Sequence, residues 1–141
     1  MEFGELLKAF LLDLQSLFRF QVSNPDLTLP QILLLSSISD EGVDMSSLSK
    51  QMGVDNSTMT RLIDVLIRNG WAIKYKNKKD GRVVMVEITK KGEVLQEEID
   101  KNIDKFGFEI YNSISLEDRE EVMEILTEFH WVLSKNLLRS Q

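Results

Sequence analysis

Side chains that could bind an extended anion are concentrated in residues 55–89. Ser57, Arg61, Asp64 and Arg68 recur there at a spacing that places them on one side of a helix. The opposite side of that helix is apolar and consists of Met59, Leu62, Ile63, Leu66 and Ile67. We therefore expect one side to pack against the protein and the other to be free to contact a ligand.

A basic turn follows this helix. Lys78, Lys79 and Arg82 surround the pair Asp80-Gly81. Asp-Gly is the dipeptide that best tolerates the positive φ angles of a tight hairpin, so we expect a hairpin turn here. The three cations would then lie just beyond the polar face of the helix.

Charge is distributed unevenly along the 141 residues. The formal net charge of −6 would by itself argue against a nucleic-acid partner. Residues 45–92, however, contain ten lysines and arginines and four acids, a net of +6, so the remaining residues carry −12. A solvated surface does not need such segregation, whereas a nucleic-acid footprint on an otherwise repulsive protein does.

The composition argues against catalysis. The chain has no cysteine, a single histidine, His130, no phosphate-cradling glycine loop and no metal-ligand spacing. No nucleophile–base pair is visible, so we expect no enzyme activity, cofactor or metal site. No apolar run approaches the roughly 18 residues of a membrane span, and the charged N-terminal helix is unlike a signal peptide, which predicts a cytoplasmic protein.

Capping signals divide the centre of the chain into two helices joined by a short turn. The first, 45–52, has Asp44 before it and Gly53 after it, and the second has Asp55 before it and Gly70 after it. The second cap would accept a backbone N–H of the first turn and leave the outer side chains of that turn free. This is the layout of a helix-turn-helix.

Two strands follow the second helix. Residues 71–76 alternate apolar and basic side chains, so one side should pack while Lys74 and Lys76 point away from it. Residues 84–88 alternate likewise and form the return strand, with the hairpin tip at 77–81.

Amphipathic helices bracket this centre. Helix 3–22 has a wider apolar sector than a lone surface helix needs, so we expect it to bury against another chain. Thr28 begins a capping box, and long helices are predicted from Lys90 to about Asn112 and from Ser115 onward. The inward positions of the helix from Lys90 are expected to be Leu95, Ile99, Ile103, Phe106 and Ile110. The fold class is therefore mainly α with a small β-wing.

The whole chain resembles the multiple-antibiotic-resistance regulator (MarR) family of winged helix-turn-helix transcription factors. The most specific part is STMTRLIDVLIRNGWAIKYKNKKDGRVVMVEITKKG, which looks like the recognition helix, the wing with an Asp-x-Arg tip, and the start of the fifth helix. Further support comes from Leu27-Thr28-x-x-Gln31 and from Leu116-Glu117-Asp118.

The resemblance implies a single domain, 1–141, in which a DNA-binding lobe at 28–89 is flanked by dimerisation helices at 1–22 and 90–141. It implies a homodimer that binds a pseudo-palindromic operator in double-stranded DNA. The implied function is sequence-specific transcriptional regulation, by a repressor that a small apolar or phenolic effector releases.

The resemblance also assigns DNA-binding roles to nine residues, namely Ser57, Thr58, Thr60, Arg61, Arg68, Lys78, Lys79, Asp80 and Arg82. Arg61 should read guanine, because only a planar fork can bond O6 and N7 together, whereas Arg68 should hold a phosphate. Arg82, oriented by Asp80, should enter the minor groove, and the two lysines should neutralise phosphates without reading sequence. Gly81 stands where many relatives have a second arginine, which predicts a weaker or more flexible wing.

Each of these assignments has a simpler alternative. The basic hairpin could be a solvated turn, and Asp80 could be a turn former. Arg61 could pair with Asp64 or Asp55 to hold the helix. His130 fits a packing or interface position better than a pH or ligand sensor. The aromatic side chains fit a core as well as they fit an effector pocket.

Two other classes of function are weighed against DNA binding. A winged-helix module could bind protein instead, but its wing need not be basic, so the local charge of +6 argues against this alternative. A steep loss of affinity with salt would distinguish the two. A metal sensor would need a carboxylate-rich site around His130, for which the sequence gives little support.

Overall fold

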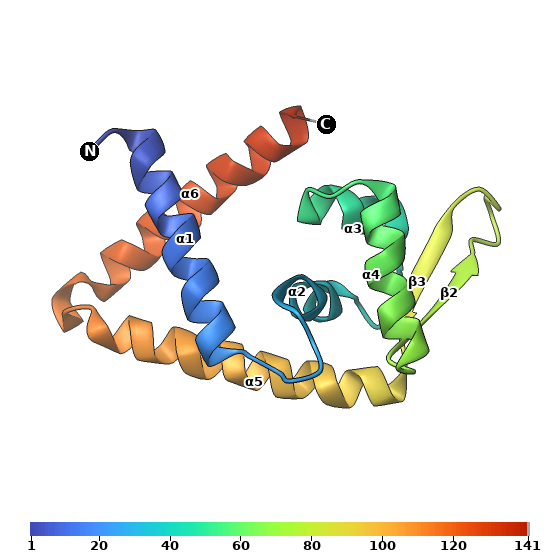
Figure 1. The fold of residues 1–141 in the computed structure, drawn as a ribbon. Coiled ribbons are helices and arrows are strands. Elements are labelled where there is room, and N and C mark those ends of the chain that lie inside the picture. The colour runs from blue at the N-terminus through green and yellow to red at the C-terminus, as the bar shows by residue number, and fades with distance from the viewer. Residues whose placement is uncertain (141) are drawn as a thin grey trace. The chain divides into compact units, whose positions relative to one another are not determined.

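The helix-turn-helix and the wing lie at the centre of the element order in the computed structural model, which describes residues 1–140 (Figure 1). The elements are α1 (Phe3–Gln21), α2 (Leu29–Ser37), β1 (Val43–Asp44), α3 (Met45–Met52), α4 (Asn56–Arg68), β2 (Ala72–Lys76), β3 (Val84–Ile88), α5 (Lys90–Ser113), η1 (Leu116–Asp118) and α6 (Arg119–Arg139). This order confirms the predicted fold class. The chain forms two compact units, Met1–Ile103 and Asp104–Gln141.

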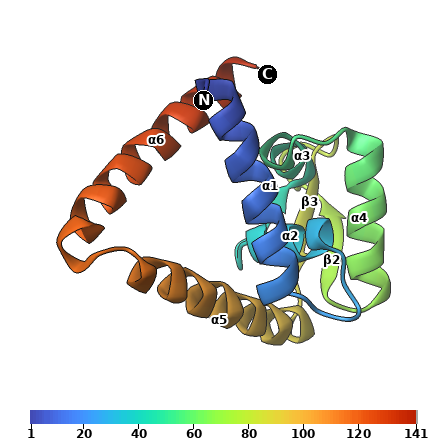
Figure 2. The ribbon, with the colours of Figure 1, turned by 60° about the vertical axis from the view of Figure 1, so that its left-hand side comes forward.

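The two helices of the helix-turn-helix begin at the predicted caps. Asp44 Oδ1 accepts a hydrogen bond from the Ser47 N–H at 2.8 Å, and Asp55 Oδ1 accepts one from the Thr58 N–H at 2.7 Å. Gly53 ends α3 with a φ of 66°, which is cheap only for glycine. The short turn that joins α3 and α4 is visible in Figure 2.

A core of aliphatic side chains holds the first unit together. Among its fully buried members are residues of α2, α3, α4 and β3, namely Leu34, Leu35, Leu48, Met59, Ile63, Leu66 and Val86. Burying one such side chain contributes about 1.5–3 kcal/mol. The apolar side of α4 is therefore fixed against the lobe, as predicted, and its polar side is left outward.

The sheet corrects one prediction about the wing. The strand order is β1-β3-β2, all antiparallel, and Lys74 lies opposite the buried Val86. Lys74 is therefore on the packed side of β2 with the buried Ala72, whereas Ile73, on the other side, is 49% exposed. Lys74 and Lys76 are both exposed, as predicted, but the expectation that the opposite side of β2 packs was wrong, because Trp71, the buried residue of that side, belongs to the preceding turn.

The hairpin tip also differs from the prediction. Gly81 does not adopt a positive φ, so Asp80 and Gly81 do not form a tight two-residue turn. A longer loop is closed by a hydrogen bond from the Asn77 N–H to the Val83 carbonyl at 2.8 Å. The Asn77 side chain also accepts from the Lys79 N–H at 2.8 Å, because Asn readily caps a turn two residues ahead.

Helix α5 begins as predicted but is less buried toward its C-terminal end. The Thr89 hydroxyl oxygen caps the helix by accepting from the Gly92 N–H at 3.0 Å. Ile99 and Phe106 are buried, whereas Ile110 is 40% exposed, so its predicted inward position is wrong for the single chain.

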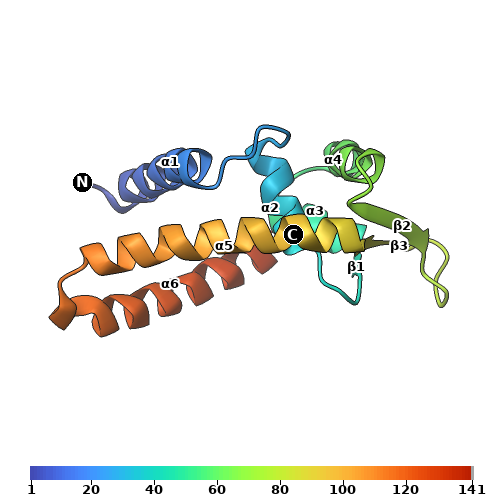
Figure 3. The same ribbon diagram turned by 90° about the horizontal axis from the view of Figure 1, so that it is seen from below.

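The second unit consists of the end of α5, η1 and α6. The chain reverses direction at η1 (Figure 3), where Arg119 donates from Nε to the Ile114 carbonyl at 3.0 Å. Large apolar side chains of α6 are exposed in the chain described, namely Met123, Ile125, Leu126, Trp131, Val132, Leu133, Leu137 and Leu138. None of the helices within residues 1–140 is both long enough and apolar enough to cross a bilayer.

Candidate nucleic-acid interface

Of the five predicted residues of α4, Ser57, Arg61 and Arg68 are exposed. Thr58 and Thr60 are half-buried. The structure therefore places the five predicted residues of α4 in two groups, an exposed row along the helix and two threonines that turn partly toward the protein.

The first turn of α4 is organised by Asp55. Its carboxylate accepts from the Thr58 N–H and from the Ser57 hydroxyl, at 2.7 and 2.9 Å. These bonds, led by the one from the Thr58 backbone, hold the pKa of Asp55 below its ordinary value of 3.8. The expectation that this cap leaves the outer side chains free is wrong for Ser57, because its hydroxyl proton is directed to Asp55.

Thr60 is oriented toward α3 rather than outward. Its hydroxyl donates to the Asn56 carbonyl at 2.8 Å and lies 3.9 Å from the Met45 sulfur. A threonine at this position of a helix commonly bonds the carbonyl four residues earlier. Thr60 is therefore the predicted residue of α4 that the structure ties most closely to the lobe itself.

Arg61 is exposed and keeps most of its guanidinium donors free. Its Nε donates to the Ser57 carbonyl at 3.5 Å, and within residues 1–140 it forms no ion pair. Asp64, the suggested partner, pairs with Lys74 at 3.4 Å instead. The structure thus does not form the Arg61–Asp64 pair that was an alternative to a ligand-binding role.

The wing tip holds one arginine in a fixed direction. Arg82 Nε donates to Asp80 Oδ1 at 3.2 Å, a second guanidinium nitrogen donates to Oδ2 at 3.4 Å, and the Arg82 N–H donates to Oδ1 at 3.0 Å. The side-chain bond from Arg82 is the largest cause of the lowered pKa of Asp80. The Arg82 side chain remains 92% exposed, and Lys78 and Lys79 beside it are exposed as well.

A groove connects the wing to the start of the helix-turn-helix. It has a volume of about 520 Å³ and is lined by Asp44, Met45, Ser46, Asn56, Arg82, Val83 and Val84. The first residue of α4 and the wing arginine thus face one space. Arg68, at the other end of α4, does not line it.

Asn56 was missed by the sequence analysis. It is the first residue of α4, it is exposed, and its side chain makes no hydrogen bond within the described part of the chain. The signal for it was available, because the residue that follows an N-cap is the first to project from a helix N-terminus.

A helix-turn-helix followed by a basic wing, with the start of α4 and the wing arginine lining one groove, defines the class of winged helix-turn-helix transcriptional regulators. The family model for the transcriptional regulators SarA/Rot matches residues 16–99, which is more than half of the chain. The protein therefore belongs to the SarA/Rot family of transcriptional regulators. Both the family and the fold are those of regulators of transcription.

Two relatives illustrate the extent of the sequence similarity. YhbI of Bacillus subtilis, an uncharacterised HTH-type transcriptional regulator, is 29% identical over 90 residues, which are 63% of this chain and 58% of YhbI. SarZ of Staphylococcus aureus, an HTH-type transcriptional regulator, is 22% identical over 112 residues, 79% of this chain and 72% of SarZ. The chain thus matches less than two thirds of the length of YhbI.

Solved structures confirm the predicted resemblance to the MarR family at the level of the fold. Apo MarR from Escherichia coli superposes with a TM-score of 0.78 at 23% identity, covering 92% of this chain and 97% of MarR. FabT of Streptococcus pneumoniae, in complex with DNA, gives 0.75 at 20% identity, covering 94% and 95%.

Proposed function

We propose that the protein binds an operator in double-stranded DNA through α4 and the wing, and thereby regulates transcription sequence-specifically. The observation that carries the proposal is the placement of Arg82, which Asp80 holds at an exposed tip while it lines the same groove as Asn56 at the start of α4. One duplex could therefore contact the helix and the wing together. FabT, which has the same fold, has been solved with DNA. A DNA target also implies that the protein acts in the cytoplasm.

The residues of α4 divide into reading and holding roles. Arg61 has the free guanidinium fork that guanine recognition requires. Ser57 and Thr58 lie one turn earlier, where a helix N-terminus approaches base edges and phosphates. Arg68 lies at the far end of the helix and is assigned to a phosphate. Thr60 supports the position of the helix through its contact with α3 and contributes little direct contact.

The wing supplies charge and one shape-reading side chain. Arg82 would enter the minor groove, where a narrow A·T tract concentrates negative potential. Lys78 and Lys79 are exposed beside it and would neutralise phosphates without distinguishing sequences. Asp80 keeps the guanidinium of Arg82 directed before DNA arrives, so less side-chain entropy is lost on binding.

We further propose that two copies bind a pseudo-palindromic operator, with 1–22 and 90–141 as dimerisation helices and 28–89 as the DNA-binding lobe of each copy. In support, α1 exposes Phe3, Phe10, Leu11, Leu12, Leu14, Leu17 and Phe20. A surface helix of a monomer rarely exposes so much apolar area. Two-fold protein symmetry would then be matched by two-fold symmetry in the DNA.

Selection of bound DNA from a random pool tests these proposals together. The expected result is enrichment of one sequence with two related half-sites, bound with an affinity that falls steeply as salt is raised. Enrichment of nothing, or binding that does not change with salt, would instead favour a winged-helix module that contacts protein.

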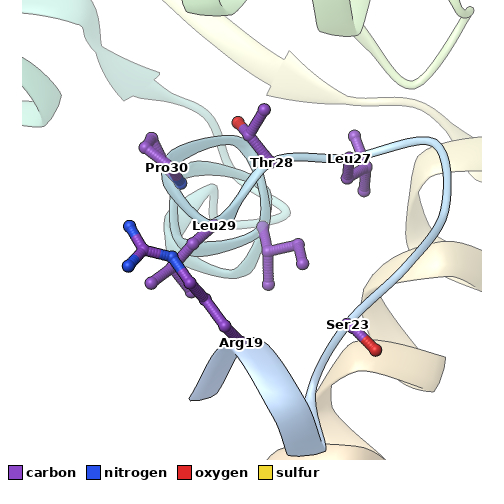
Figure 4. Close-up of a pocket in the computed structure, with 7 residues that line it drawn as sticks. Arg19, Ser23, Leu27, Thr28, Leu29 and Pro30 are labelled. Atoms are coloured by element: carbon purple, nitrogen blue, oxygen red, sulfur yellow. The ribbon is translucent and has the colours of Figure 1, made fainter. Parts of the chain in front are cut away.

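The predicted small-molecule effector has a candidate cavity in the first unit. A space of about 340 Å³ is lined mainly by apolar side chains of α1, α2 and the end of α3, among them Leu11, Phe18, Leu33 and Met52. An adjoining cavity of about 390 Å³ shares Arg19, which extends from the end of α1 toward the first turn of α2 (Figure 4).

Arg19 is the charged member of the described residues that line these two cavities. We propose that an apolar or phenolic effector occupies them and releases the repressor from DNA. Benzoate and phenol are suitable probes in an operator-release titration. Benzoate should release the wild type at lower concentration than it releases Arg19→Met, while phenol should affect both equally. Failure of both probes to bind would contradict an effector site here.

A further inference from the structure

The end of α4 is fixed to the start of α5 through three consecutive backbone carbonyls. Lys91 Nζ donates to the Asn69 carbonyl at 2.9 Å, and the Thr89 hydroxyl donates to the Gly70 carbonyl at 2.6 Å. The Thr89 N–H donates to the Trp71 carbonyl at 3.0 Å. We call residues 69–71 and 89–92 the α4–α5 joint. Each carbonyl that follows α4 thus has a donor from the beginning of α5.

Gly92 is the point of closest approach within the α4–α5 joint. A Cβ atom at this position would lie 2.0 Å from the Trp71 carbonyl oxygen and 2.7 Å from a side-chain carbon of Ile88. The φ of Gly92 is not positive, so the requirement for glycine is one of space. The joint could not close at this distance with any other residue at position 92.

Lys91 belongs to the joint, although it lies in the basic stretch. Its ammonium group bonds a carbonyl just past the C-terminus of α4, where a cation also interacts favourably with the helix dipole. Lys90, the adjacent residue, is exposed and forms no hydrogen bond or ion pair in the described structure. Two neighbouring lysines of equal charge therefore have different surroundings.

The beginning of α5 also holds a second helix end. Gln96 donates from Nε2 to the Leu35 and Ile38 carbonyls, both at 2.9 Å, where α2 ends. Because the first two turns of α5 bond the C-terminal ends of both α2 and α4, they form the frame against which the direction of α4 is set.

We infer that Lys91 and Gly92 are positioning residues for DNA recognition, which set the direction of α4 through the α4–α5 joint without touching DNA. The inference rests on the proposed function, since α4 must read base edges for its direction to matter. Base readout needs side-chain atoms aligned with fixed groups in the groove, whereas phosphate attraction tolerates misalignment. Disturbing the joint should therefore reduce discrimination between DNA sequences more than it reduces general affinity.

The first test compares Lys91→Met with Lys90→Met, using the selected operator and a scrambled duplex over a range of salt. Lys91→Met should lower the ratio of operator to scrambled affinity by about tenfold, which is the order of one base contact, and should keep the salt slope of the wild type. Lys91→Arg can still donate to the Asn69 carbonyl and should restore the ratio. If Lys91→Met instead lost affinity equally for both duplexes and its salt slope fell by about one, Lys91 would be a phosphate contact, and its assignment as a positioning residue would be overturned.

The second test measures the angle between α4 and the start of α5 in DNA-free protein, from residual dipolar couplings of the backbone amides. Gly92→Ala and Lys91→Met should change this angle, whereas Lys90→Met should not. Unchanged angles would overturn the inference even if the variants melt at lower temperature. If Gly92→Ala does not fold, Lys91→Met decides. If the wild type shows no operator preference, the proposed function fails, and the angle still decides whether the joint directs α4.

Discussion

Hydrogen bonds made within the free protein determine which single residues can donate to DNA. The hydroxyl protons of Ser57 and Thr60 are directed to Asp55 and to a backbone carbonyl. Most groups on the DNA surface, including the phosphates and the guanine edge, are acceptors. Arg61 keeps guanidinium donors that these two hydroxyls lack, and it lies nearer the start of α4 than Arg68, so we expect it to carry most of the direct readout.

Arg61→Ala should lower operator affinity by about 1–3 kcal/mol and relax the preference at one base pair in each half-site, because the bidentate contact with guanine is lost. Lys79→Ala is the matched control, since it removes one exposed positive charge without removing a base contact. It should weaken all duplexes about equally and reduce the salt slope by about one. Unchanged operator binding by both variants would contradict the assignment of this surface to DNA.

A double-mutant cycle on Asp80 and Arg82 tests whether Asp80 orients Arg82 or only forms the turn. Arg82→Ala should weaken operators with A·T-rich flanks more than those with G·C-rich flanks, because the minor groove is narrow in A·T tracts. In the wild-type background, Asp80→Asn should produce part of the same loss of operator affinity. In the Arg82→Ala background, Asp80→Asn should cause almost no further loss. Gel-shift measurements on the four proteins of this double-mutant cycle give the coupling. An additive cycle would leave Asp80 only its role in the turn.

At the scale of elements, local sequence signals were enough to predict the helices. The features that these signals missed depend on tertiary packing. The caps at Asp44 and Asp55 lie next to the backbone groups that they bond, so sequence alone located α3 and α4. The packed side of β2 was not predictable in the same way. It depends on where the turn after Gly70 ends, and Trp71 bonds back to the Leu66 carbonyl at 2.9 Å instead of entering the strand.

In the candidate site, too, some features follow from the local sequence and others depend on tertiary packing. Arg61, Arg68, Lys78, Lys79 and Arg82 are exposed, as their spacing in the sequence predicted. The groove that unites the wing with the start of α4 could not be predicted, because it brings together residues that are distant in the sequence. The contact between Thr60 and α3 likewise depends on how two helices pack, which no local pattern encodes.

The cap of α4 should make the stability of the lobe depend on pH. The folded-state pKa of Asp55 is lowered, chiefly by the backbone N–H of Thr58, so its contribution is complete above the ordinary value of 3.8 and is lost as pH falls through the lower folded value. Asp55→Ala should have a lower melting temperature than the wild type at pH 7. The difference in melting temperature should become smaller below about pH 4. Thermal melts followed by circular dichroism measure it, with Asp40→Ala, an exposed acid that caps no helix, as control. A difference in melting temperature that stays constant down to pH 2 would contradict the role of the Asp55 carboxylate as the cap of α4.

At the scale of the whole molecule, charge and apolar surface are separated along the chain. The stretch 45–92 has a net charge of +6 and the remainder −12, so DNA is repelled from most of the protein and attracted to one part of it. Most of the exposed large apolar side chains lie outside that stretch, on α1 and α6 above all, although Ile73 and Tyr75 of β2 are exposed within it. On the proposed dimer, this separation would let one region bind DNA while another binds a second copy.

Phe10→Glu should dissociate the proposed dimer, because it places a charge in the apolar surface of α1, where Phe10 is 45% exposed. Analytical ultracentrifugation at micromolar concentration should show a dimer for the wild type and a monomer for the variant, with a concentration-dependent loss of operator binding. Lys8→Glu, on the same helix, controls for the added negative charge. A monomeric wild type would contradict the terminal-helix dimer.

The loop between β2 and β3 closes through bonds among its own residues, namely from Asn77 to Val83, from Lys79 to Asn77 and from Arg82 to Asp80. These bonds involve no residue of the helix-turn-helix, so the loop can close by itself. Residues 77–83 can be treated as an interchangeable cassette, which could be exchanged between regulators of this fold to alter their minor-groove affinity. The sequence preference of the recipient's own recognition helix should survive the exchange.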